Sequence, residues 1–181
     1  MHTLIVGRTV SGKSALAKRV GSRLRLRGVE VLAFNPTKEK GYTLKDEFGC
    51  AAAEWETEDR DEFMREVVRR IKEKPGKRVL IIDEAHTFFS RLEGTEYNWL
   101  ATRGRHFGIS VIAITQKATL INPTLRGQCA TVFLFQCSLT DAKFIADEYG
   151  NSDFKKCSDL PRGQYLEISA SGDVKKGVIF Q

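Results

Sequence analysis

The sequence has little of what marks a disulfide-stapled, zinc-binding or membrane-spanning protein. It contains only four cysteines, Cys50, Cys129, Cys137 and Cys157, which form no C-x-x-C pair and have no histidine at zinc-ligand spacing. We therefore expect small buried residues or free thiols in a reducing compartment. No apolar run approaches the roughly 18 residues that a membrane span needs, and a strand pattern that starts at residue 3 leaves no room for a signal peptide. These absences predict a soluble, cytoplasmic protein.

The chain also lacks internal repeats, low-complexity tracts and any linker rich in Pro, Gly or Ser. Its 181 residues, 41% hydrophobic and 29% charged, have the composition of an ordinary globular protein. We predict a single domain over residues 1–181, large enough to bury a proper core. The net charge of +6, from 29 Lys+Arg against 23 Asp+Glu, is only a mild indication of a polyanionic partner, because surface solubility also produces such an excess.

A phosphate-binding pattern lies near the start of the chain. Residues 7–14 read Gly7-Arg8-Thr9-Val10-Ser11-Gly12-Lys13-Ser14 and fit G-x-x-x-x-G-K-[ST] at every fixed position. The glycines let the backbone wrap tightly, so that its N–H groups and the following helix N-terminus point at an anion. We expect Lys13 to reach the β- and γ-phosphates and the Ser14 hydroxyl to ligate Mg²⁺. This loop, the P-loop below, predicts binding of a nucleoside triphosphate.

Apolar strand patterns alternate with helical patterns along the chain. This alternation is typical of a mostly parallel sheet with helices on both faces, a three-layer αβα P-loop NTPase. Helices are expected from Lys13 to about Arg27, from an N-cap at Thr57 to Lys74, and over Ser138–Tyr149. The tail, Gln164–Ser169 and Gly177–Phe180, reads as a β-hairpin. The predicted core strands are Thr3–Val6, Val29–Phe34, Val79–Ile82, Ser110–Thr115 and Thr131–Gln136.

Two carboxylates follow the third predicted strand. Asp83 and Glu84 come directly after Val79–Ile82, so they should lie at the carboxyl edge of the sheet where the nucleotide binds. We expect Asp83 to hold Mg²⁺ opposite Ser14 and Glu84 to act as general base toward the attacking water. His86, two residues further on, is either structural or a contact to phosphate or a partner.

A polar amide follows the fourth predicted strand. Gln116 ends Ser110–Thr115, where it can sense the γ-phosphate or orient water. This pattern is typical of NTPases that insert an extra strand between the P-loop strand and the Asp-Glu strand. We therefore expect the RecA-like, additional-strand arrangement of the fold.

Arginines precede the same strand. Multimeric NTPases complete their sites with an arginine from a neighbouring subunit, which stabilises charge on the transferring phosphoryl group. Arg103 and Arg105 are the candidates for this role, and Arg126 is a weaker third. Sequence alone does not choose between them.

These motifs together resemble the FtsK/HerA superfamily of DNA-translocating ATPases. The resemblance rests on the P-loop, on Leu80–His86, on Gly104–Gln116 and on Asn122–Cys129, and it extends over essentially the whole chain. Within the superfamily, the chain is most similar to the small genome-packaging ATPases of tailless, membrane-containing double-stranded DNA viruses. It departs from many members in carrying no appended domain for DNA guidance or membrane anchoring.

The resemblance implies a function and partners. It implies ATP hydrolysis with Mg²⁺, a homo-oligomeric ring (a hexamer or pentamer), and movement of DNA, double-stranded in preference, through the ring. A capsid vertex or portal protein would then be a partner, and the host cytoplasm and the virion the locations. The segments Lys38-Glu39-Lys40 and Lys117-Ala118-Thr119 become candidates for lining the DNA channel.

Three alternative functions stay open at this point. A filamentous-phage-type assembly ATPase, acting on single-stranded DNA, shares Asp83–His86 and Thr115-Gln116 but usually carries a transmembrane segment. A small nucleoside kinase would share an Asp-Glu followed by two phenylalanines, but typically has zinc-binding cysteine pairs. A nucleotide-gated DNA-binding protein would need neither Glu84 nor Gln116.

Overall fold

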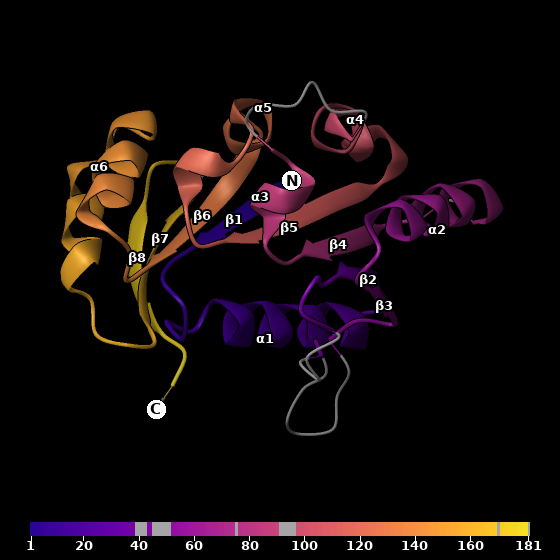
Figure 1. Cartoon of the computed structure of the whole chain (residues 1–181), viewed down its shortest axis with the longest axis horizontal. Coiled ribbons are helices and arrows are strands. Elements are labelled where there is room, and N and C mark those ends of the chain that lie inside the picture. The colour runs from indigo at the N-terminus through magenta and orange to yellow at the C-terminus, as the bar shows by residue number, and fades with distance from the viewer. Residues whose placement is uncertain (39–42, 45–51, 75, 91–96, 170, 181) are drawn as a thin grey trace.

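The chain forms one twisted sheet covered by helices on both faces. The computed structural model describes residues 1–38, 43–44, 52–74, 76–90, 97–169 and 171–180. The sheet has eight strands in the order β3-β2-β4-β5-β1-β6-β7-β8 (Figure 1). It is parallel from β3 to β6, and β7 and β8 add an antiparallel edge. The strands are β1 His2–Val6, β2 Glu30–Phe34, β3 Trp55–Thr57, β4 Arg78–Ile82, β5 Ile109–Thr115, β6 Cys129–Phe135, β7 Gln164–Ser169 and β8 Val174–Val178.

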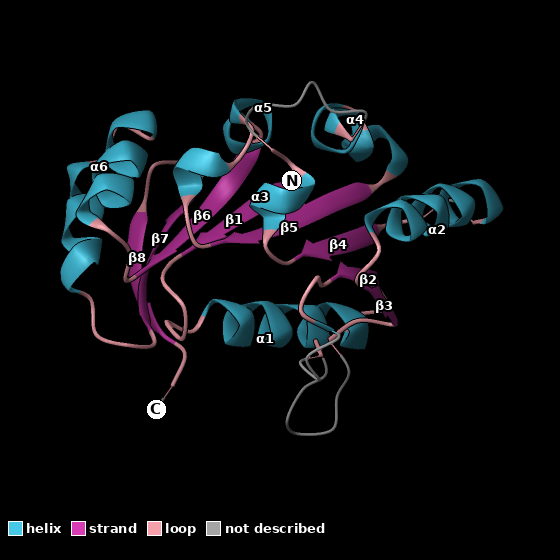
Figure 2. Cartoon of the chain, in the orientation of Figure 1, coloured by secondary structure: helices cyan, strands magenta, loops and turns pink. Residues whose placement is uncertain are grey.

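Helices and short helical turns connect these strands (Figure 2). The longest are α1, Lys13–Leu26, and α2, Arg60–Glu73, followed by α6, Leu139–Glu148. The α-helices α3, Ala85–Phe88, α4, Asn98–Thr102, and α5, Pro123–Gly127, are short. The 3₁₀ segments are η2 Gly104–Phe107, η3 Ala118–Leu120 and η4 Ser152–Asp159.

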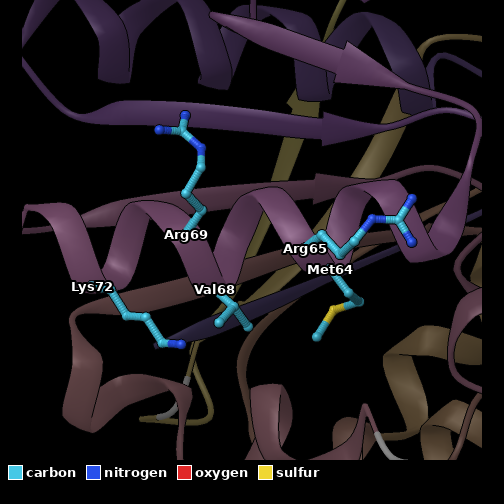
Figure 3. Close-up of a pocket in the computed structure, with 5 residues that line it drawn as sticks. All are labelled: Met64, Arg65, Val68, Arg69 and Lys72. Atoms are coloured by element: carbon cyan, nitrogen blue, oxygen red, sulfur yellow. The ribbon is translucent and has the colours of Figure 1, made fainter.

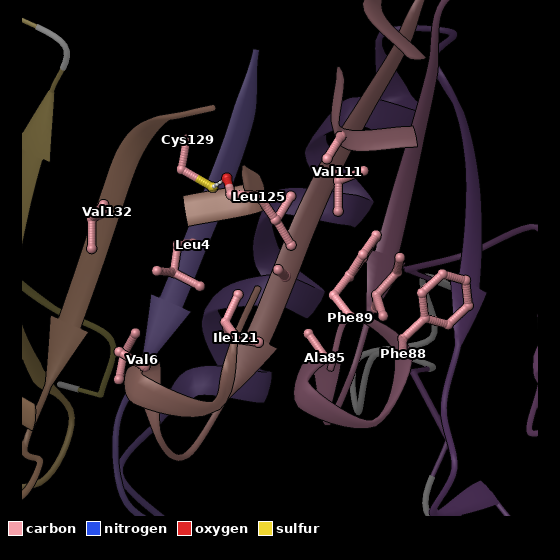
Figure 4. Close-up of a cluster of buried hydrophobic side chains, with 14 of the residues drawn as sticks. Leu4, Val6, Ala85, Phe88, Phe89, Val111, Ile121, Leu125, Cys129 and Val132 are labelled. Carbon is pink, nitrogen blue, oxygen red and sulfur yellow. Dashed lines mark hydrogen bonds between the residues drawn. The ribbon is translucent and has the colours of Figure 1, made fainter. Parts of the chain in front are cut away.

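Two apolar clusters make the three layers. Successive residues of a strand point to opposite faces, so Leu4 and Val6 join one cluster while Ile5 joins the other. The first cluster packs the sheet against α2 to α6, with Phe88 and Phe89 fully buried (Figure 4). The second packs it against α1, on the opposite face (Figure 1). The predicted αβα architecture is confirmed.

The five predicted core strands are all present, with starts displaced by one or two residues. β3 is absent from the prediction because its three residues are too short to show a pattern. The C-terminal hairpin is confirmed, but β8 begins at Val174 rather than Gly177, because Val174 already pairs with Ile168 across the turn.

The start of α2 corrects the sequence prediction. Thr57 is the last residue of β3 and pairs with Phe34, so it does not cap the helix. Asp59 is the N-cap, and its carboxylate accepts a hydrogen bond from the Glu62 N–H at 2.7 Å. The N-cap of α6 is Ser138, the first residue of the predicted segment, and its hydroxyl accepts from the Asp141 N–H at 3.0 Å.

The cysteines of the described residues are free and buried. They are Cys129, Cys137 and Cys157, and burial raises the pKa of each thiol to about 12. Cys129 donates to the Leu125 carbonyl at 3.2 Å (Figure 4). Cys50 lies outside the described residues. Within the described part of the chain, no helix is long and apolar enough to cross a membrane.

Candidate active site

The P-loop joins β1 to α1 at the carboxyl edge of the sheet. The Gly7 N–H donates to the Thr115 carbonyl at 3.3 Å and the Arg8 N–H to the Gln136 carbonyl at 2.7 Å, so the loop is tied to the strands on both sides. Gly12, with φ of 116°, precedes α1, and a Cβ there would lie 2.9 Å from both Ile179 and Phe135 atoms. Only glycine fits this position. Val10 is also left-handed (φ 64°), an uncommon conformation for a β-branched residue.

The start of α1 is suited to an anion. All residues of α1 and its N-cap, Gly12, are among the described residues. Within them, the helix N-terminus has no side-chain cap and no acidic residue in its first turn. The Lys13 side chain is buried, and its Nζ atom donates to the Arg8 carbonyl at 2.6 Å. Burial lowers the pKa of Lys13, while the charges of Asp83 and Glu84 act in the opposite direction. A partly desolvated ammonium at a helix N-terminus is a strong partner for phosphate oxygens.

Asp83 ends β4 inside the site. Only 7% of the residue is exposed, and its Oδ1 atom accepts a hydrogen bond from the Glu84 N–H at 2.9 Å. The pKa of Asp83 is raised to about 6, chiefly by burial and further by the Glu84 charge, against the opposing effect of Lys13. A buried carboxylate of this kind is stabilised by a cation. Asp83 and the Ser14 hydroxyl, in the first turn of α1, are hard oxygen donors of the type that Mg²⁺ prefers, so the residues fit this metal.

Glu84 turns sharply after β4 and meets Gln116. Its backbone is left-handed (φ 45°, ψ 47°), a strained conformation for a residue other than glycine. Its Oε1 atom accepts from the Gln116 amide nitrogen at 2.9 Å, and its Oε2 atom lies 3.3 Å from the His86 Nδ1 atom. His86 therefore lies next to the Glu84 carboxylate.

Gln116 also reaches the P-loop. The Thr9 hydroxyl donates to the Gln116 amide oxygen at 3.3 Å, so one side chain bridges Thr9 and Glu84. This is possible because β5 lies between β4 and β1, as expected for an additional-strand NTPase. The structure thus brings together the predicted residues Lys13, Asp83, Glu84 and Gln116. The sequence does not predict the contact of Thr9, because the P-loop motif allows any residue at this position and does not indicate what it contacts.

The arginines lie elsewhere. Arg103 and Arg105 are exposed residues in and beside η2, before the first residue of β5, whereas Gln116 follows its last residue. Seven strand residues at about 3.3 Å each separate the two ends of β5. Neither arginine can therefore reach the P-loop of its own chain.

Arg126 is not available to a neighbouring subunit. It is 5% exposed, and its Nε atom donates to Glu148 at 2.8 Å. Its Nη1 atom donates to the Ala118 carbonyl at 3.3 Å and to the Ile121 carbonyl. Its guanidinium lies 4.7 Å from the Phe144 ring centre. Arg126 is a structural residue, which corrects its place as a third candidate.

The segments expected to line a channel are only partly accessible. Lys38 is half-buried and donates to the Glu56 carbonyl at 2.9 Å, while Glu39 and Lys40 lie outside the described residues. Lys117 is exposed, but Ala118 is buried beneath it.

A surface hollow on α2 is separate from this site. It is lined by Met64, Arg65, Val68, Arg69 and Lys72, all from that helix (Figure 3). None of these residues belongs to the P-loop or to the strand ends that carry Asp83 and Gln116. The hollow is therefore not part of the nucleotide site.

Comparisons with known proteins agree with this geometry. A family model described as an AAA domain matches residues 1–120. Protein P9 of Pseudoalteromonas phage PM2 is 25% identical over 204 aligned residues, which cover 100% of this chain and 92% of P9. A probable helicase of Methanocaldococcus jannaschii is 30% identical over 107 residues, 55% of this chain, but the chain spans only 20% of the helicase.

A solved structure shares the whole fold. The genome packaging NTPase B204 from Sulfolobus turreted icosahedral virus 2, in complex with AMPPCP, superposes with a TM-score of 0.80 at 21% identity. The match covers 99% of this chain and 97% of B204. With the family match over residues 1–120 and the P-loop, Asp83, Glu84 and Gln116 gathered at one sheet edge, the chain belongs to the AAA-domain family and is a P-loop ATPase.

Proposed function

We propose that this ATPase is a DNA translocase that packages a viral double-stranded DNA genome into a preformed capsid. The observation that carries the proposal is the bridge from Thr9 through Gln116 to Glu84. It connects the loop that holds the phosphates to the carboxylate that would activate water, as a machine that couples hydrolysis to movement requires. The likeness to a viral genome packaging NTPase over nearly the whole chain supports the same function.

Each side chain has a role in hydrolysis. Lys13 and the N-terminus of α1 hold the β- and γ-phosphates, and Ser14 and Asp83 would hold Mg²⁺, which neutralises phosphate charge when bound. Glu84 accepts a proton from the attacking water, while the Gln116 amide orients Glu84 and the water. Arg103 or Arg105 of an adjacent subunit completes the site in a hexameric or pentameric ring.

Duplex DNA provides the test of this function. The ATPase rate of the purified chain with Mg²⁺ is measured at about 50 and 150 mM salt with duplex DNA, single-stranded DNA or RNA. We expect duplex DNA to raise the rate several-fold, and less so at the higher salt. No response to any of the three would contradict translocation, and a response to single-stranded DNA alone would favour the filamentous-phage-type assembly ATPase.

A matched pair of lysine variants locates the DNA contact. Lys117 and Lys155 are both exposed, but Lys117 follows Gln116 directly whereas Lys155 lies on η4. We expect Lys117→Ala to lose most of the DNA stimulation and Lys155→Ala to retain it. Equal stimulation of the two variants would remove Lys117 from the DNA path.

A further inference from the structure

The C-terminal segment packs directly against the P-loop. The Gly163 N–H, just before β7, donates to the Ser11 carbonyl at 3.0 Å, and the Ile179 N–H donates to the Gly163 carbonyl at 2.8 Å. Ile179 is buried against Gly12, and its carbonyl accepts from Arg19 of α1 at 3.0 Å. The chain after β8 is therefore held in place beside the phosphate site, and Phe180 follows at once.

Phe180 lies on a fixed support. A Cβ at Gly163 (φ 81°) would lie 2.5 Å from the Phe180 ring, so only glycine allows the ring to approach this closely. The Arg162 guanidinium lies 5.5 Å from the ring centre, within the range of a cation–π contact. Nevertheless 44% of Phe180 is exposed. An aromatic ring that is held by its neighbours yet open to solvent is available for stacking.

The polarity of the nucleotide places its base on this side. Asp83, Glu84 and Gln116 follow β4 and β5, so the γ-phosphate lies on the β4–β5 side of the P-loop. A triphosphate that runs along the loop then carries its nucleoside toward the opposite side, which is formed by β6, β7 and β8. Gly163 and Ile179 contact the loop there, and their chain neighbours Arg162 and Phe180 lie next to them.

We propose that Phe180 is the platform on which the nucleobase of the bound nucleoside triphosphate stacks, and that Arg162 positions this ring. Every base offers a π-face, so stacking stabilises binding with little base selectivity beyond stronger contact with the larger purines. The inference rests on the chain's binding of ATP at the P-loop and is independent of DNA translocation.

Inorganic tripolyphosphate separates stacking from support of the loop. Binding of ATP and of tripolyphosphate is measured by calorimetry for the wild type, Phe180→Ala and Phe180→Tyr. We expect Phe180→Ala to weaken ATP binding by about 5- to 100-fold and to leave tripolyphosphate binding unchanged, because only ATP has a base. Phe180→Tyr keeps an aromatic face and should bind ATP as the wild type does, and the wild type should bind ATP more tightly than UTP.

Two further variants serve as controls. Phe107, also exposed at 49%, lies in η2 before β5, away from the P-loop, so Phe107→Ala should change neither affinity. Lys13→Ala should weaken both ligands, since it removes a phosphate contact. Wild-type ATP affinity in Phe180→Ala, or an equal loss of both ligands, would overturn the platform while leaving the ATPase site intact. Failure of the wild-type chain to bind either ligand would overturn the nucleotide site itself.

Discussion

At the scale of single residues, the site combines charged groups whose burial costs folding free energy with residues held in strained backbone conformations. Lys13 and Asp83 are both buried, Glu84 is held in a left-handed conformation, and a β-branched residue, Val10, takes a positive φ in the loop. Such strain and desolvation are typical of functional sites, where the surrounding structure holds residues in conformations they would not adopt alone. The sequence predicts the identity of these residues because their motifs are specific. It does not predict the Thr9–Gln116–Glu84 bridge, which depends on side-chain geometry.

Replacement of Asp83 by Asn should stabilise the nucleotide-free protein at neutral pH. The folded-state pKa of about 6 lies above the unfolded value of about 3.9, so the native state retains a proton that the unfolded state has lost. Stability therefore falls as pH rises from about 4 to about 6, by up to about 3 kcal/mol, and Asp83→Asn removes that loss.

The measurement is denaturant unfolding at pH 4 and pH 7 with a chelator present. Asp83→Asn should match the wild type at pH 4 and exceed it at pH 7. Asp147→Asn, at an exposed position on α6, is the control and should change stability little at either pH. A variant no more stable than the wild type at pH 7 would contradict the burial cost of Asp83.

At the scale of elements, the order of the strands makes the site. β5 lies between β4 and β1, so the residues that follow these strands share one edge of the sheet. The predicted apolar patterns located all five core strands, which have five to seven residues in the structure. Three-residue β3 and the short helices escaped prediction because their tertiary contacts, rather than any period, define them. Tertiary contacts also explain why α2 is capped by Asp59 rather than Thr57, because Thr57 pairs with Phe34 in the sheet.

Arg126→Ala should destabilise the fold rather than act only on catalysis. Arg126 connects η3, α5 and α6 through the Ala118 and Ile121 carbonyls and Glu148, and its removal leaves these acceptors without their charged donor. We expect unfolding to become easier by about 2–4 kcal/mol, less than for a fully buried pair because Glu148 is partly exposed. Chemical denaturation checks this, with the exposed Arg103→Ala as a control expected within about 0.5 kcal/mol of the wild type.

At the scale of the whole molecule, the site is split between subunits in our proposal. The two exposed arginines lie at the edge of the sheet opposite to the P-loop, where a neighbouring copy in a ring would present its own nucleotide site. The chain's formal net charge of +6 would also favour a polyanion in the ring. The sequence could suggest a trans arginine by resemblance, but only the length of β5 shows that neither arginine acts within its own chain.

Mixed assemblies test the split site. Glu84→Gln subunits lack the general base but keep both arginines, while Arg103→Ala/Arg105→Ala subunits keep the base. Each variant alone should be inactive. An equimolar mixture should recover a measurable fraction of the wild-type ATPase rate, because at some interfaces the Glu84 of one variant meets the arginines of the other. No recovery in mixtures that are shown to co-assemble would contradict an arginine acting in trans.

The most direct test of the account is the steady-state ATPase rate of Glu84→Gln, measured with Mg²⁺ and saturating ATP beside ATP binding by the same variant. Glutamine preserves the size of the side chain and a hydrogen-bond partner for Gln116 but cannot take a proton from water. We predict ATP affinity within about threefold of the wild type and a loss of about 10²-fold or more in rate. Hydrolysis at the wild-type rate would contradict the role of Glu84 and, with it, the catalytic site described above.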